Sequence, residues 1–265
     1  MEIVGYILAI LIGVSLGLIG GGGSILTVPV LVYIFHIDPT SATAYSLFIV
    51  GVTSLAGAAA YMKRGEVAYK TAFLFAIPAF LTVYLTRRFI VPAIPDILFE
   101  FSGIVFSRDL MIMIVFAFLM LGASYSMIKK ISVKPKVNHG KRDFIFLALQ
   151  GIIVGFLTGL VGAGGGFMII PTLVLFANLD MKRAIGTSLM IISANSLIGF
   201  MGAFGANMVI DWMFLMLMSG IAVIGIFMGS RMTKFIPGSK LKPAFGWFVL
   251  VMGVFIIGKE ISKIL

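Results

Sequence analysis

The sequence has few charged residues and no cysteine. Asp, Glu, Lys and Arg make up 11% of its 265 residues, against 60% hydrophobic residues, whereas a soluble domain carries about 25% charged residues. This composition cannot build a water-facing surface, so a soluble domain is excluded. The absence of cysteine excludes disulfides, zinc-thiolate sites and thiol chemistry. The two histidines fall in loops without a metal-ligating pattern, so we expect neither a metal nor a cofactor.

Long apolar runs separate the few charged clusters. In lipid each run must satisfy its own backbone hydrogen bonds as a helix, and the alternating polarity of a membrane β-barrel is absent. The first run follows Glu2 and continues into glycines, so we interpret it as a retained helix and not as a cleaved signal peptide. The predicted segments are 3–19, 25–35, 41–62, 71–91, 109–128, 144–161, 167–177, 184–204, 213–230 and 243–258.

Two of these segments, 25–35 and 167–177, are too short to cross a bilayer comfortably. A crossing takes about 20 residues, and at about 1.5 Å per residue each short segment covers only roughly 17 Å. Both follow a glycine cluster. We therefore predict two half-helices, each preceded by a glycine-rich break.

The two glycine clusters belong to an internal repeat. With an offset of 142 residues, GLIGGGGSILTVPVL from Gly17 pairs with GLVGAGGGFMIIPTL from Gly159. The correspondence continues without a gap beyond the glycines, which chance glycine enrichment does not explain. The further pairs are Asp38 with Asp180, Ala42 with Ala184, Ser46-Leu47 with Ser188-Leu189, Ser54-Leu55 with Ser196-Leu197, and Gly57 with Gly199.

The positive charges predict the orientation of the two halves. Lys and Arg cluster in the loops near residues 63–70, 129–142, 182–183 and 231–242, and cytoplasmic loops carry an excess of these residues. All four loops can be cytoplasmic at once, with both termini external and the second half inverted relative to the first. The inversion holds whether the short segments cross the membrane or re-enter it. The net charge of +10 is thus a topology signal and not a nucleic-acid footprint.

The predicted fold is an all-α polytopic membrane protein with two inverted-topology repeats. We expect a first repeat over residues 1–128, a basic cytoplasmic linker over 129–143 and a second repeat over 144–265, integrated in one membrane domain. Inverted halves with broken helices are typical of transporters that bind substrate near mid-membrane. The expected location is the cell (inner) membrane.

The glycine breaks offer a geometry for an anion. Backbone N–H groups ahead of a helix N-terminus, together with the positive end of its dipole, favour a bound anion. The apolar segments contain almost no Lys, Arg or His that could neutralise one instead. A packing role is the alternative for glycines, and we assign it to those spaced by four, which are Gly13, Gly17, Gly151, Gly155 and Gly159.

Uncharged polar residues form a stripe in the third segment of each half. Seven- and eight-residue spacings place them on one side of a helix, and they recur at positions matched by the repeat. They either hydrogen-bond neighbouring helices together or contact the ligand. The predicted substrate-binding residues are Gly20, Gly21, Gly22, Gly23, Ser24, Ser46, Thr53, Ser54, Gly162, Gly164, Gly165, Gly166, Ser188, Asn195 and Ser196.

Four other charged residues receive structural interpretations. Asp38 and Asp180 each precede a predicted helix, where we expect a helix-capping role. Arg87 and Arg88 end an apolar segment, and we expect them to extend toward the membrane surface and anchor it. Selectivity for an anion would then depend on neutral hydrogen bonds and helix ends, without a buried cation.

The doubled motif, with A-x-x-x-S-L after each copy (Ala42 to Leu47 and Ala184 to Leu189), resembles the sulfite exporter TauE/SafE family. The resemblance covers nearly the whole chain. It implies a secondary transporter for sulfite, sulfonates or related sulfur oxyanions, with the two glycine–proline motifs as the substrate region. A carrier for another small anion or metabolite, and a membrane protein without transport activity, remain alternatives, and a homo-oligomer is left open. No nucleophile with a base, carboxylate–histidine cluster or nucleotide-binding motif indicates an enzyme.

Overall fold

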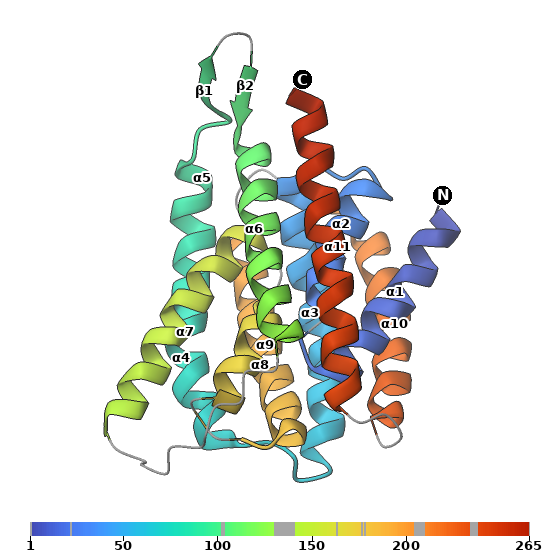
Figure 1. Cartoon of the computed structure of the whole chain (residues 1–265), viewed down its shortest axis with the longest axis vertical. Coiled ribbons are helices and arrows are strands. Elements are labelled where there is room, and N and C mark those ends of the chain that lie inside the picture. Colours follow the sequence, from blue (N-terminus) through green and yellow to red (C-terminus); the bar gives the residue numbers. More distant parts are fainter. Residues whose placement is uncertain are drawn as a thin grey trace.

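The computed structural model describes residues 2–21, 23–101, 104–129, 141–162, 164–175, 177, 179–203, 210–233 and 238–264. Almost all of this part is helical (Figure 1). Its elements are α1 (Glu2–Ile19), α2 (Ser24–Tyr33), α3 (Pro39–Met62), α4 (Tyr69–Leu85), the π-helix η1 (Thr86–Ile90), α5 (Val91–Ala93), β1 (Ile97–Phe101), β2 (Ile104–Ser107), α6 (Arg108–Ile128), α7 (Lys141–Val161), α8 (Gly166–Leu175), α9 (Met181–Ala203), α10 (Trp212–Met232) and α11 (Gly238–Ile264).

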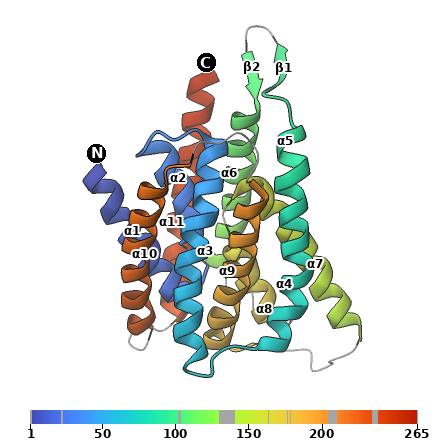
Figure 2. The same ribbon diagram turned by 180° about the vertical axis from the view of Figure 1, so that it is seen from behind.

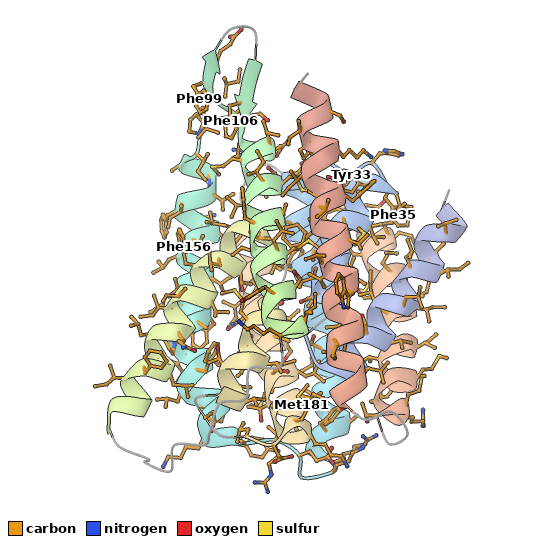
Figure 3. The ribbon with its side chains drawn as sticks, viewed as in Figure 1. Tyr33, Phe35, Phe99, Phe106, Phe156 and Met181 are labelled. Atoms are coloured by element: carbon orange, nitrogen blue, oxygen red, sulfur yellow. The ribbon has the colours of Figure 1, made fainter. Side chains whose placement is uncertain are left out.

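The helices confirm the predicted all-α membrane protein. Four helices in the described part are long and apolar enough to cross a membrane: Pro39–Met62, Tyr69–Ala93, Met181–Ala203 and Trp212–Met232. Large apolar side chains cover the outside of the molecule, as the side-chain view shows (Figure 3). On α4, for example, Phe73, Ile77 and Leu81 recur every four residues and are exposed. A surface of this kind is stable against lipid and not against water.

Each of the two short helices forms a hairpin with the helix before it. In the first hairpin, the ring of Phe35, just after α2, lies 5.9 Å from that of Tyr6 at the start of α1. At the other end, a Cβ on Gly23 would lie 2.5 Å from Ser15 Oγ. The helix α2 therefore returns to the side from which α1 begins. In the second hairpin, Leu147 of α7 and Leu173 of α8 share one buried cluster.

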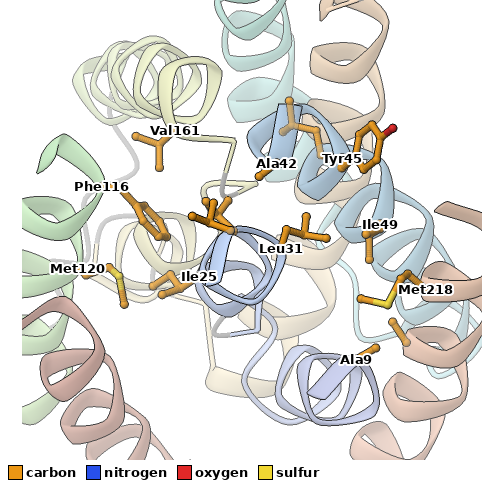
Figure 4. Packing of buried hydrophobic residues seen from close by; sticks show 14 of the residues in the cluster. Ala9, Ile25, Leu31, Ala42, Tyr45, Ile49, Phe116, Met120, Val161 and Met218 are labelled. Carbon is orange, nitrogen blue, oxygen red and sulfur yellow. The ribbon is translucent and has the colours of Figure 1, made fainter. Parts of the chain in front are cut away.

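The half-helix α2 lies in the core of the molecule. Its residues from Ser24 to Val32 are buried, apart from Leu26. Figure 4 shows Ile25 and Leu31 surrounded by side chains from α1, α3, α6, α7 and α10. A helix that is apolar on all sides is expected in such a position. The glycine break before α2 is consequently inside the protein.

The helices of the two sequence halves pack in reciprocal pairs. The bounds of α2 and α8 differ by 142 residues at both ends, the offset of the sequence repeat. The first helix of each half packs on the fourth segment of the other, α1 on α10 and α7 on α4, while α3 packs on α9 and α6 on α11. Figures 1 and 2 show these pairs, and α1 and α7 begin at opposite ends of the molecule.

Glycines make two of these contacts close. A Cβ on Gly17 of α1 would lie 2.5 Å from Ile226 O of α10, and one on Gly151 of α7 would lie 2.6 Å from Phe75 O of α4. The other three glycines pack as closely: Gly13 against α10, Gly155 against α4 and Gly159 against η1. The packing role predicted for these five glycines is confirmed. The capping role is also confirmed, since the carboxylates of Asp38 and Asp180 accept hydrogen bonds from Ser41 N and Arg183 N.

Two local features were not predicted. Residues expected to form a plain loop between α5 and α6 make an antiparallel hairpin of β1 and β2, in which the rings of Phe99 and Phe106 stack at 4.7 Å. The π-helix η1 interrupts the long segment after α4. Of the predicted linker, residues 130–140 lie outside the described residues, and α7 already begins at Lys141.

Candidate functional site

The two glycine breaks have backbone conformations that favour glycine. Gly20 has a φ of 75°, and Gly162, Gly164 and Gly165 have φ values of 73°, 66° and 71°. Residues with a Cβ rarely adopt these angles. Each break therefore ends one helix and allows the chain to reverse into the next. The predicted Gly22 lies outside the described residues.

The breaks of the two halves meet inside the protein. A Cβ on Gly21 would lie 2.7 Å from Gly166 Cα, so the two backbones are in direct contact. Gly20 packs on Ile185 of α9, and Gly162 packs on Thr43 of α3, which are positions related by the same repeat offset. In this conformation the glycines are packed against protein, so the close-packing role extends to the breaks themselves.

Three of the predicted polar residues are already hydrogen-bonded. Ser24 Oγ donates to Gly21 O at 2.7 Å, and Thr53 Oγ1 donates to Ile49 O at 2.6 Å. Ser188 Oγ lies 3.0 Å from Gly20 O and 2.8 Å from Ile185 O. These hydroxyls stabilise the break and the helices around it.

The other four predicted polar side chains are fully buried and have no hydrogen-bond partner among the residues that the structure describes. They are Ser46, Ser54, Asn195 and Ser196, and for Asn195 both the amide oxygen and the amide nitrogen are unpartnered. Burying a polar group without a partner costs roughly 1 to 3 kcal/mol. Native proteins leave few such groups. Four of them in matched stripes therefore indicate a polar region that a ligand or water completes.

The packing of α3 on α9 brings two of these side chains, Ser54 and Ser196, to the same level of the molecule. Leu47 lies against Gly199, and Gly51 lies against Leu197. Positions 54 and 196, which are equivalent in the repeat, therefore both lie near the middle of this crossing. Ser196 Oγ is also 3.1 Å from the position of a Cβ on Gly164. The second glycine break thus joins the stripe of α9.

Two buried threonines extend this polar region, and the sequence interpretation missed both. Thr158 of α7 lies beside Gly165, and Thr86, the first residue of η1, lies beside Gly159. Their Oγ1 atoms are buried, and no described residue forms a hydrogen bond with them. Thr158 directly precedes the second motif, which is the signal that could have identified it.

Arg87 corrects the interpretation of the arginine pair. Its side chain is only 3% exposed, so it does not extend to the membrane surface. Within the described part of the chain, its Nε and Nη2 atoms have no hydrogen-bond partner. Arg88 is exposed, as expected. The helical period separates the two, because Arg87 continues the buried face of Ala79 and Val83, whereas Arg88 continues the lipid face of Leu81. The expectation that the interior contains no cation is wrong.

An apolar groove of about 680 Å³ lies between α1, α2 and α11. None of the predicted binding residues lines it. Its lining is mainly aliphatic, with Lys259 at one side, where the Nζ lies 4.2 Å from the centre of the Tyr33 ring. An anion would find few hydrogen-bond donors there, so we place the candidate site at the glycine breaks.

Comparison with known proteins agrees with a transport role. The family model described as sulfite exporter TauE/SafE matches residues 6–256. A probable membrane transporter protein of Xylella fastidiosa is 26% identical over 256 residues, covering 94% of this chain and 92% of the relative. The probable membrane transporter protein YdhB of Bacillus subtilis is 27% identical, covering 88% of this chain and 91% of the relative. One of Methanocaldococcus jannaschii is 30% identical, covering 77% and 72%.

No solved structure matches the chain. The family match covers nearly all of the sequence, and the relatives are named as membrane transporters. The protein is therefore a multi-pass membrane transporter and not an enzyme, and it acts on a small substrate in a lipid bilayer. The chain belongs to the sulfite exporter TauE/SafE family.

Proposed function

We propose that this protein is a secondary transporter for a small sulfur-containing anion, such as sulfite, a sulfonate or a related oxyanion. We place the bound anion near mid-membrane, between the two repeats. The observation that carries the proposal is the group of buried, unpartnered polar side chains from both halves, Ser46, Ser54, Asn195 and Ser196. The family of the chain supports the substrate class.

The chemistry of this region suits an anion. Hydroxyl groups and an amide nitrogen can donate hydrogen bonds, and α2 and α8 begin directly after the two breaks, so the positive ends of their helix dipoles lie there. In a low-dielectric interior each of these donors interacts more strongly than in water.

We also propose that the halves have inverted topology in the inner membrane, with both termini external. The basic ends of several helices lie together, which supports a common cytoplasmic side. Arg64 Nη1 donates to Ser230 O near the end of α10 at 3.2 Å. Ala68 N donates to Thr187 Oγ1 near the start of α9 at 2.9 Å. The N- and C-terminal ends of the chain both lie toward the opposite, upper side of the molecule, apart from each other (Figure 1).

The proposal can be tested by flux measurements in proteoliposomes. The panel contains sulfite, thiosulfate, sulfoacetate, sulfate and acetate, with protein-free liposomes as the control. We expect saturable transport of at least one of the sulfur anions and little transport of acetate. Transport of acetate alone would assign the protein to another class of anion. No transport of any member by folded, correctly inserted protein would refute the proposal.

A further inference from the structure

We infer that Arg87 binds two oxygens of the transported oxyanion through its Nε and Nη2 atoms. This inference rests on the proposed function and names the charged group that recognises the substrate. Arg87 lies in η1, six residues before the end of the long segment at Ala93, or roughly 9 Å along the helix axis. It is 3% exposed, so neither lipid headgroups nor bulk water surrounds it.

The protein supplies no counter-charge to Arg87 among the residues that the structure describes. Within that part, the ion pairs are those of Arg108 with Asp96 and Arg183 with Asp180. A buried charge without a partner is strongly unfavourable, and ionisable residues inside a membrane are usually functional for that reason. A mobile anion is the group that would compensate this charge.

The two unpartnered nitrogens define the shape of that anion. Nε–H and one N–H of Nη2 point in the same direction from one edge of the planar guanidinium group. This edge matches two oxygens bonded to one atom, as in a sulfite, sulfonate or carboxylate, with two parallel hydrogen bonds. A monatomic anion such as chloride can accept both bonds only at a single atom, so the two parallel bonds favour an oxyanion over chloride.

The position of Arg87 connects it to the unpartnered polar side chains. Asn195, Gly199 and Gly202 lie on one face of α9, at spacings of four and three residues. Gly202 faces Arg87, since a Cβ added to Gly202 would lie 3.1 Å from Arg87 Cβ. One turn earlier, Gly199 faces Val83. Asn195 is two turns, roughly 10 Å, from Gly202 along α9.

The helix geometry favours a side-chain conformation in which Arg87 extends toward this polar region. Long side chains on a helix lean toward its N-terminus. From Arg87 this direction leads toward Val83, which lies opposite Gly199 of α9. Thr86, the neighbour of Arg87, is buried and unpartnered and lies beside Gly159 of α7. The geometry therefore centres the anion between α4, η1, α7 and α9.

The repeat gives Arg87 no counterpart, so the site is asymmetric. The equivalent position in the second half is Gly229, which packs closely on Val14 of α1. A side chain could not be accommodated there. The first half thus supplies the cation, while the second half supplies the neighbouring glycine break and the amide of Asn195.

Binding measurements on three variants of the purified full-length protein test the inference. The variants are Arg87→Gln, Arg87→Lys and, as a matched control, Arg88→Gln on the exposed side of the same turn. Sulfite, sulfoacetate, acetate and chloride serve as probes. For whichever oxyanion the parent binds, Arg87→Gln should weaken binding by about ten- to 150-fold, because two hydrogen bonds to a charged donor are lost.

The lysine variant and the stability measurement separate recognition from a structural role. Arg87→Lys keeps the positive charge but loses the pair of parallel N–H groups, so its affinity for oxyanions should also fall by about ten-fold or more. Without anion, Arg87→Gln should unfold at a temperature no lower than the parent, because an unpaired buried charge has been removed. Arg88→Gln should bind as the parent does.

Each outcome is decisive for the inference. Equal affinity of Arg87→Gln and the parent for an oxyanion would overturn it, as would chloride binding that depends on Arg87 and is tighter than the binding of any oxyanion. Anion-free destabilisation of Arg87→Gln with unchanged affinity would identify Arg87 as structural. If the parent binds acetate but no sulfur anion, the proposed function fails while the role of Arg87 is still tested with acetate. If the parent binds no oxyanion, both fail.

Discussion

Replacing Asn195 by leucine should change stability and binding in opposite directions. The side chain is fully buried in α9, and neither its amide oxygen nor its amide nitrogen has a partner. Burying an unpartnered polar side chain costs roughly 1 to 3 kcal/mol. Leucine has a similar size and no polar atom. Without anion, Asn195→Leu should therefore be more stable than the parent by about 1 to 3 kcal/mol.

The same substitution should weaken the binding of sulfite. Loss of one buried hydrogen-bonding partner costs roughly 1 to 3 kcal/mol, which corresponds to about five- to 150-fold in affinity. The assay is thermal unfolding of the purified protein in detergent over a series of sulfite concentrations. The parent should gain stability with added sulfite, and Asn195→Leu should begin higher and gain less.

Ser193→Ala provides a matched control in the same helix. Ser193 Oγ donates to Met190 O at 2.9 Å, so its hydroxyl is satisfied inside α9. This variant should respond to sulfite as the parent does. The reasoning would be refuted if Asn195→Leu were less stable than the parent and retained its affinity for sulfite, because the amide would then be a packing element.

Further predictions concern packing and topology. Gly155→Ala should destabilise the protein by about 1 to 3 kcal/mol, because the added Cβ would meet Ala79 of α4. The control Gly220→Ala should be neutral or slightly stabilising, because its Cβ would meet nothing within 4 Å. Equal unfolding temperatures for the two variants would contradict the packing of α7 on α4. Because the chain has no cysteine, single cysteines report topology. An impermeant thiol reagent added to intact cells should label Phe99→Cys in β1 and not Lys63→Cys, and the reverse result would invert the proposed orientation.

The local sequence pattern was sufficient to predict the helices and their breaks. Hydrophobic runs and glycines act over a few residues, so the ends of α2 and α8 could be predicted to within two residues. The repeat then assigned matching roles to Gly20 and Gly162, whose positive φ values agree with a break. The pairing of α1 with α10 was not predicted, since it depends on contacts between distant segments.

The arginine pair shows where the pattern was misread. Arg87 and Arg88 were interpreted together, although neighbouring residues on a helix point in directions about 100° apart. The apolar residues after them, from Phe89 to Ala93, already place both within the segment and not at its end. A period count from Ala79 through Val83 would have assigned Arg87 to the buried face. The hairpin of β1 and β2 is stabilised by the contact of Phe99 with Phe106, which no local signal predicted.

The most direct test of a sulfur-anion site between the repeats is sulfite flux in proteoliposomes containing the parent, Ser196→Ala or Ser193→Ala. Both serines lie in α9. Ser196 Oγ lies beside the second glycine break and has no hydrogen-bond partner among the described residues, whereas Ser193 Oγ is hydrogen-bonded within its helix. We predict saturable flux for the parent, a KM about five- to 150-fold higher for Ser196→Ala, and parent-like flux for Ser193→Ala. Saturable sulfite flux with the same KM in all three proteins would contradict a site at these buried polar groups, and the absence of sulfite flux in the folded parent would contradict sulfite as the substrate.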